Sequence, residues 1–364
     1  MPFDVRDFPG APPEDRAAGR RSRRMVATWL FTIALMILVM IVLGGVTRLT
    51  GAGLSIMEWA PLAGVLPPMS DAEWQRLHHL YQQIPQYALV NDGLSLAGFK
   101  RIFWLEWIHR LWGRLIGLVF IVPLIWFWST GRIERRGRLR LALLFVLGGL
   151  QGAVGWFMVA SGFERETTAV SPYRLVIHLA LALGLYAAIL WTGLTVLRPV
   201  PPRPAAARLL YWLAWACCGC VVLTMLAGGF VAGIHAGLDY NTFPLMDGRL
   251  VPQEYGRLEP FVRNLTENIA AVQFDHRLLA TLTVLAAVGT VVIGFAVNSP
   301  RGCRLALLAL LGAASVQYLL GMATLLLVVP IALATLHQAA ATLLLTATIV
   351  LMHNTRPPPL RTRP

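Results

Sequence analysis

Long apolar stretches alternate along the chain with polar connections, and most of the shorter connections are rich in arginine. Eight apolar stretches are each close to the roughly 20 residues that an α-helix needs to cross the hydrocarbon layer of a membrane. They lie near residues 25–46, 103–128, 140–161, 172–197, 208–233, 268–297, 303–327 and 330–352. The pattern therefore predicts an all-α polytopic membrane protein with eight transmembrane helices.

The arginines predict the orientation of these helices. They gather in the N-terminal tail, in the connections after the second, fourth and sixth apolar stretches, and in the C-terminal tail. Eight spans place all of these segments on one side, which the positive-inside rule assigns to the cytoplasm. We expect residues 1–24 to be a disordered cytoplasmic tail and residues 354–364 a second cytoplasmic tail. The long connections 49–102 and 234–267 then lie outside, with a short interfacial helix expected within 71–87.

The two halves of the chain repeat the same motifs in the same order. GGVTRLTGAGL at Gly44–Leu54 returns as GGFVAGIHAGL at Gly228–Leu238, and EWIHR at Glu106–Arg110 returns as QFDHR at Gln273–Arg277. QGAVG likewise returns as QYLLG. Four spans per half give both halves the same orientation, related by an axis along the membrane normal. We therefore expect two pseudo-symmetric four-helix bundles. Their predicted bounds are residues 25–200 and 201–353.

The composition agrees with this architecture and narrows the partners. Of the 364 residues, 57% are hydrophobic and 13% charged, which excludes an ordinary soluble domain. A net charge of +13 would suggest nucleic acid in a soluble protein. Because the arginines stand mainly in short connections, we assign them to membrane topology, and expect lipid rather than nucleic acid as a partner. The four cysteines lie in or beside apolar stretches, so we expect no disulfide framework.

One histidine stands near the outer start of each even-numbered span. They are His109, His178, His276 and His337. At 1.5 Å per residue they lie roughly 9–12 Å inside the predicted helix starts, at one depth. Two imidazoles that face each other across a bundle core suit the two axial positions of a haem iron. The alternative, four hydrogen-bonded packing residues, explains the equal depth and the repeat less well, and a zinc site lacks a third close ligand in each half.

The halves differ in the acidic residue one turn before the histidine, since Asp275 adjoins His276 on a different face. Glu106 precedes His109 by one helical turn, whereas Val272 and Gln273 occupy this region of the second half. A buried carboxylate beside a haem can accept a proton or stabilise developing charge. An ion pair with Arg110 is the structural alternative. We therefore expect the first half to be catalytic and the second to carry an electron-transfer haem.

Other polar residues in the spans have less specific interpretations. Arg110 and Arg277 each follow a histidine and could pair with haem propionates or anchor the helices at the interface. Gln151 and Gln317 suit hydrogen bonds between helices. The remaining histidines are expected at the surface or the membrane interface. They are His78, His79, His235 and His353.

At these motifs the chain resembles the haem A synthase family. The matching stretches are GGVTRLTGAGLS, FKRIFWLEWIHRLWGR, QGAVGWFMVASG, GLDYNTFPLMDGRLVP, VQFDHR and LHQ. The resemblance implies oxidation of the C8 methyl group of haem O to a formyl group by successive hydroxylations, giving haem A for cytochrome oxidase. It implies that His109 and His178 hold the substrate haem, that Glu106 is the catalytic carboxylate, and that His276 and His337 ligate a haem b cofactor.

The chain departs from the family pattern in two places. Its first outer connection has no cysteine pair, so it resembles the proteobacterial and mitochondrial branch, and Gly98 stands where an acidic residue is expected. The resemblance implies a bacterial inner-membrane protein that works with a haem O synthase and a ferredoxin-like or quinol electron donor, and it allows a homo-oligomer. The alternatives are a diheme b-type cytochrome that only carries electrons, against which Glu106 argues, and a haem transporter, which needs no second haem.

Overall fold

The computed structural model describes residues 13–60, 63–164, 167–198 and 207–356. Within them, eight helices are long and apolar enough to cross a membrane, and each coincides with a predicted span. The prediction of an all-α polytopic membrane protein is thus confirmed. The eight helices are α1 (Pro13–Leu49), α4 (Leu96–Ser129), α5 (Arg135–Ala160), α6 (Pro172–Leu197), α7 (Ala207–Gly233), α9 (Ile269–Ala296), α10 (Arg301–Leu326) and α11 (Ile331–Thr355).

The eight helices pack as two closed rings of four. In the first half α1, α4, α5 and α6 contact one another in that order around a ring, and in the second half α7, α9, α10 and α11 do the same. The halves meet through α6 against α7, α1 against α11, and α6 against α11. In the repeat, α1 corresponds to α7 and α6 corresponds to α11. The contact of α6 with α7 is therefore equivalent to the contact of α11 with α1, and an approximate twofold axis relates the halves.

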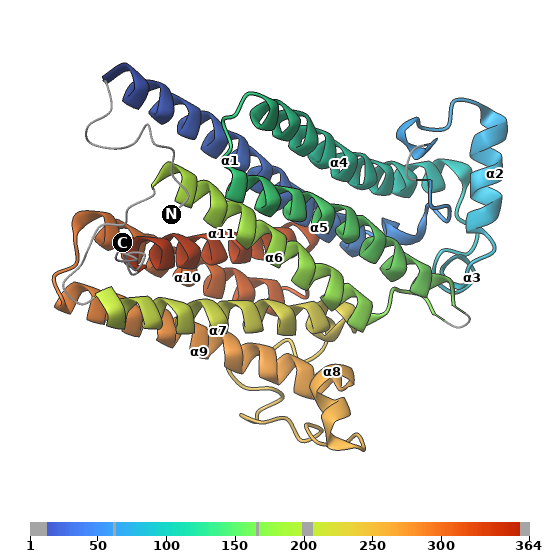
Figure 1. The fold of residues 1–364 in the computed structure, drawn as a ribbon. Helices are drawn as coiled ribbons and strands as arrows, with labels where there is room; N and C mark the ends of the chain where they lie inside the picture. Colours follow the sequence, from blue (N-terminus) through green and yellow to red (C-terminus); the bar gives the residue numbers. More distant parts are fainter. Residues whose placement is uncertain (1–12, 61–62, 165–166, 199–206, 357–364) are drawn as a thin grey trace.

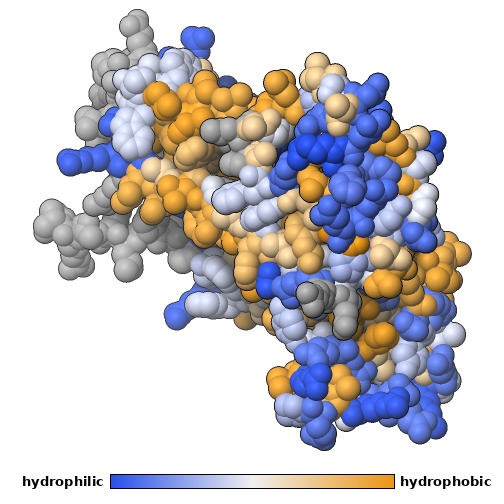
Figure 2. All heavy atoms as spheres, turned by 90° about the vertical axis from the view of Figure 1, so that its right-hand side faces the viewer, coloured by the Kyte–Doolittle hydropathy of each residue, from blue (hydrophilic) through white to orange (hydrophobic). Residues whose placement is uncertain are grey.

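The short helices all lie at one end of the bundle, which we call the loop end. It carries α2 (Asp71–Tyr81), α3 (Pro85–Val90) and α8 (Asn264–Glu267), whereas the start of α1 and the end of α11 lie at the opposite end, which we call the terminus end (Figure 1). A view onto the loop end shows hydrophilic residues gathered over the long connections (Figure 2). One interfacial helix was expected within residues 71–87; the structure has two, because a proline at the start of α3 opens a new helix after a break.

Most of the apolar core lies toward the terminus end. A single cluster of buried side chains joins all eight long helices there, and includes Leu30, Leu210, Leu307 and Leu345. A smaller cluster, with Trp74, Tyr81 and Phe99 among its members, packs the first long connection onto the start of α4. Along α4, His109 lies between Phe103 of the smaller cluster and Phe120 of the large one.

Three expectations about local structure were wrong. Residues 13–24 are helical rather than disordered, since proline is favoured at a helix start and the alanines and arginines that follow have high helix propensity; residues 1–12 lie outside the described chain. The second span starts at Leu96, because the Ser95 side chain accepts a hydrogen bond from the Gly98 N–H (3.2 Å) and caps a helix longer than its apolar stretch. His353 is only 1% exposed, since its ring packs edge-on against Trp191 between α6 and α11.

Candidate functional site

Each candidate histidine of the first half lies against a glycine of a neighbouring helix. A Cβ atom added to Gly44 of α1 would stand 3.0 Å from Cε1 of His109 on α4. A Cβ added to Gly155 of α5 would stand 2.8 Å from Cε1 of His178 on α6. These distances are shorter than ordinary carbon contacts, so both imidazoles rest where any larger residue would displace them.

The second half repeats this arrangement helix for helix. Gly228 of α7 faces His276 on α9, and Gly321 of α10 faces His337 on α11, with 2.9 Å between an added Cβ and the histidine Cε1 in both pairs. Gly228 aligns with Gly44 in the sequence repeat, and Gly321 with Gly155. The repeat therefore preserves four histidine–glycine contacts. The glycines were visible in the aligned motifs, but their role was missed because alignment does not show which helix face a glycine occupies.

The spacing of the second-half imidazoles fits a shared metal ion. The ring centroids of His276 and His337 are 6.5 Å apart and the ring planes are nearly perpendicular, at 85°. An imidazole nitrogen bonds a transition metal at about 2.0–2.1 Å, which places two axial rings roughly 6–6.5 Å apart between centroids. In the first half, His109 and His178 lie within electrostatic range of each other. The structure thus brings the four predicted histidines together as two pairs.

The ring nitrogens show how these histidines would present themselves to an iron. Nδ1 of His276 lies 3.1 Å from the carbonyl oxygen of Thr224, a contact in which the ring N–H donates and Nε2 is left for a metal. Within the described chain, the buried Nδ1 atoms of His109 and His337 have no hydrogen-bond partner. Buried polar atoms without a partner call for an explanation, such as a bound water or ion. Each half offers two imidazoles, a ligand type that haem iron takes, so the residues present fit this group.

The two glutamines of the repeat reach these rings. Nε2 of Gln151 lies 3.2 Å from Nδ1 of His178, and Nε2 of Gln317 lies 3.3 Å from Nε2 of His337. Each glutamine stands one helical turn from the glycine that faces the same histidine. The predicted bonds between helices are present, and their partners are the candidate ligands themselves.

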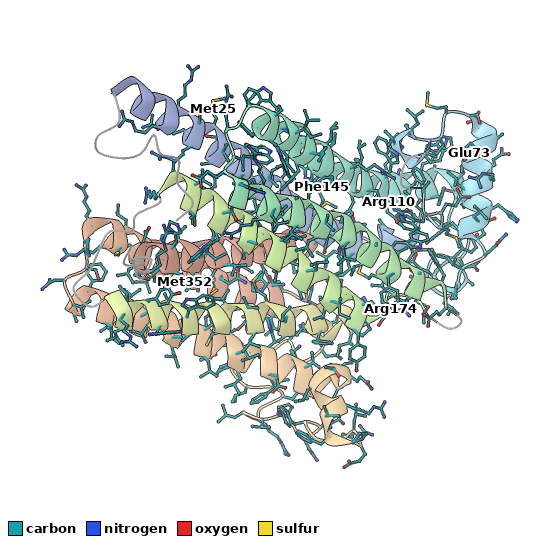
Figure 3. All side chains as sticks on the ribbon, viewed as in Figure 1. Met25, Glu73, Arg110, Phe145, Arg174 and Met352 are labelled. Atoms are coloured by element: carbon teal, nitrogen blue, oxygen red, sulfur yellow. The ribbon has the colours of Figure 1, made fainter. Side chains whose placement is uncertain are left out.

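The buried members of the large apolar cluster lie on the terminus side of the four histidines. The large buried cluster ends between the histidines and the terminus end of each even-numbered span. Its nearest members on these four helices are Phe120, Leu183, Ala287 and Leu344. In Figure 3, Arg110 and Arg174 lie toward the loop end, and Met25 and Met352 lie in the densely packed terminus end. A haem at the histidine level would therefore lie outside the close-packed core.

Glu106 is held by four hydrogen bonds. One carboxylate oxygen accepts from Nη2 and Nε of Arg110, at 2.5 and 3.0 Å. The other accepts from the Ser55 hydroxyl and the Ile56 N–H, both at 2.8 Å. Arg110 also donates to the backbone carbonyls of Ile56 (2.6 Å) and Glu58 (2.9 Å). The ion pair considered from the sequence is thus present, and it fastens the 55–58 segment over the start of α4.

Gln273 and Arg277 form the same frame in the second half. Oε1 of Gln273 accepts from Nη2 of Arg277 at 2.6 Å, and Nε2 of Gln273 donates to the carbonyls of Ala236 and Asp239. Arg277 donates to two carbonyls of residues 240–242, at 2.6 and 2.8 Å. Both arginines thus direct most of their donors to their own loop. Their predicted contact with haem propionates stays a prediction.

The remaining histidines divide between surface and interior. His79 and His235 are exposed, as expected, whereas His78 is half-buried, with its Nε2 3.0 Å from the Leu94 carbonyl. None of these three lies on the spans that carry the candidate ligands. They add nothing to either pair.

Fold and site together define a class: a polytopic membrane protein of two repeated four-helix rings, each with a histidine pair backed by glycines. Residues 27–349 match the family model COX15-CtaA, described as cytochrome oxidase assembly protein. The chain belongs to this family.

Relatives in the family carry a common name. The chain is 63% identical to the heme A synthase of Granulibacter bethesdensis over 93% of this chain and 89% of the relative. It is 47% identical to heme A synthase 2 of Acidiphilium cryptum, over 92% and 93% of the two chains, and 47% identical to the heme A synthase of Rhodospirillum centenum, over 96% and 92%. The family resemblance of the motifs is thereby confirmed.

Proposed function

We propose that this protein is a haem A synthase, an oxidoreductase that converts the C8 methyl group of haem O to a formyl group by successive hydroxylations. Its relatives carry that name over nearly their whole length. The observation that carries the assignment is the difference between two otherwise equal halves. Both have a histidine pair and an arginine clamp, by which we mean the hydrogen bond from Arg110 to Glu106 or from Arg277 to Gln273. Only the first half has a carboxylate at this position.

In the first half the chain would hold and orient the substrate. His109 and His178 take the two faces of the haem O iron, and their glycines fix the depth of each ring. Glu106 is 3% exposed and forms an ion pair with Arg110. We assign to its carboxylate the uptake of a proton as the methyl carbon is oxidised.

In the second half His276 and His337 would hold a haem b cofactor. A bis-histidine haem supplies one-electron redox chemistry when bound. The Thr224 carbonyl fixes the ring of His276, so that the ligand orientation is set before binding. The neutral Gln273 keeps the hydrogen bond from Arg277 and leaves no carboxylate at the position equivalent to Glu106.

The proposed setting follows from the same function. We place the protein in the bacterial inner membrane with both termini in the cytoplasm, as the arginine distribution predicts. Haem O synthase would supply the substrate, and a ferredoxin-like protein or quinol would exchange electrons with the second-half haem. A homo-oligomer is compatible with the exposed apolar helix faces.

The test is haem extraction and mass analysis after co-expression with an enzyme that makes haem O, in cells that otherwise lack haem A. Haem A or its hydroxymethyl intermediate is the expected result. A matched control is the H109A/H178A double variant, which should yield only haem O and haem B. If the intact protein, supplied with electrons, also yields only those two, the diheme electron carrier replaces the synthase.

A further inference from the structure

Arg48 is a cation whose donors are largely unused. It stands in the last turn of α1, and one guanidinium nitrogen donates to the Ala232 carbonyl of α7 at 2.6 Å. A guanidinium carries five N–H donors. Among the described residues this is the one hydrogen bond of Arg48, and no described carboxylate pairs with it. Most of its hydrogen-bonding capacity is therefore available to a ligand.

The direction of this side chain distinguishes it from a membrane anchor. Arginines that anchor a helix end extend toward the headgroups, where water satisfies them. Arg48 instead reaches into the junction between the two halves, to a residue 184 positions away in sequence. A charge placed inward within a membrane segment is costly and marks a functional site by default.

The repeat locates Arg48 relative to both histidine pairs. It follows Gly44 by one helical turn, about 6 Å along the axis, and Ala232 follows Gly228 by the same interval. Arg48 and Ala232 are thus equivalent positions that contact each other, which places them beside the approximate twofold axis. Because Gly44 and Gly228 each face a candidate haem ligand, the single cation lies one turn toward the loop end from both sites.

We propose that Arg48 binds the propionate carboxylates of haem at the junction of the two halves, as one cation shared by both haem positions. This inference rests on the proposed haem sites. Haem carries its two carboxylates on one edge of the macrocycle, and arginine binds carboxylates through paired N–H donors. Arg110 and Arg277, which flank the histidines, are engaged by loop carbonyls, so Arg48 has more donors to offer.

The surroundings of Arg48 supply no competing anion. His235, which follows the end of α7, is close enough to Arg48 for the arginine charge to affect its pKa. Burial and the nearby Arg48 charge lower the pKa of His235. Within the described ranges, then, no carboxylate pairs with the guanidinium of Arg48.

The test uses haem b and its dimethyl ester, in which both carboxylates are masked. The full-length protein is produced in haem-starved cells, purified in detergent and titrated with each form, with binding read from the Soret absorbance. We expect wild type to bind the free acid about tenfold more tightly than the ester, as a charged hydrogen bond predicts. R48Q should lose this preference and R48K should keep part of it.

Arg174 provides the matched control. It also lies at the loop end, but its guanidinium pairs with Glu164 at 3.1 Å, so R174Q should discriminate between acid and ester as wild type does. The inference would be overturned if R48Q preferred the free acid over the ester as strongly as wild type does. It would also be overturned if neither R48Q nor R48K bound either form of haem b. If wild type binds neither form, the haem sites and the proposed function fail together; binding without discrimination removes only the role of Arg48.

Discussion

Gln273 holds in the second half the place that Glu106 holds in the first, and each accepts a hydrogen bond from the arginine one turn later, at 2.6 and 2.5 Å respectively. A neutral amide is therefore sufficient to build this clamp. The carboxylate of the first half brings a charge that the frame does not require. That charge calls for a chemical explanation, which the proposed proton uptake supplies.

The repeat makes E106Q an informative variant. The chain already uses glutamine at the equivalent position, so E106Q should keep the clamp to Arg110 while it removes the proton-accepting group. The amide nitrogen of E106Q would face the Ile56 N–H, from which the carboxylate accepts a hydrogen bond, so we expect a loss of about 1–3 kcal/mol of stability. Haem should stay bound, and haem A formation should fall by about 10²–10⁴-fold, the range of general base catalysis. E106A should lose both activity and stability. Full haem A formation by E106Q would exclude the catalytic role.

The glycines that face the histidines should tolerate no side chain. In G155A the new methyl would meet Cε1 of His178 at 2.8 Å, so the imidazole must move and the first-half haem should be lost or bound more weakly. G152A is the matched control on the same helix, because an added Cβ there meets nothing within 4 Å among the described atoms. It should bind haem normally and gain up to about 1 kcal/mol of helix stability. Equal haem retention in both variants would contradict the role of Gly155.

The same comparison can be made in the second half. G321A places a methyl 2.9 Å from Cε1 of His337, whereas Gly312 on the same helix has open space around an added Cβ. We expect G321A to lose the low-spin haem b spectrum and G312A to keep it. A normal spectrum in G321A would show that the ring has room to shift.

The apolar pattern and the repeat predicted the eight spans and the histidine pairs, because burial in lipid constrains composition strongly. They did not predict where each helix starts or which way individual side chains point. The equal-depth argument measured His109 from an apolar boundary at Phe103, but α4 begins at Leu96 through the Ser95 cap, so helix starts do not mark depth. The position of His353 at the cytoplasmic end of the last span predicts the surface or the membrane interface, whereas its ring is buried against Trp191. Arg48 was invisible for the same reason: sequence does not show that it points between the halves.

The two histidine pairs should be separable by substitution. H276A or H337A should remove haem b and stop electron transfer, leaving a protein that still binds haem O through His109 and His178. H109A or H178A should leave haem b in place and abolish substrate binding. Pyridine haemochrome analysis of purified variants, with haem types separated by chromatography, distinguishes these outcomes. Loss of haem b from H178A with retention in H337A would reverse the assignment of the halves.

Removal of the arginine should destabilise the protein more in the first-half clamp, Arg110, than in the second-half clamp, Arg277. R110A strands a buried carboxylate, which is destabilising by about 3–5 kcal/mol, whereas R277A strands a neutral amide at about 1–3 kcal/mol. Thermal unfolding in detergent should therefore show a larger loss in R110A. Amide exchange should rise at Ile56, whose N–H donates to Glu106.

A double variant isolates the cause of this difference. If the stranded charge is responsible, E106Q added to R110A should recover part of the lost stability, because the amide needs no counter-ion in the low dielectric around it. The recovered fraction measures how much Arg110 contributes by neutralising Glu106 rather than by holding the 55–58 segment. An R110A/E106Q protein no more stable than R110A would mean that the arginine acts through its loop carbonyls alone.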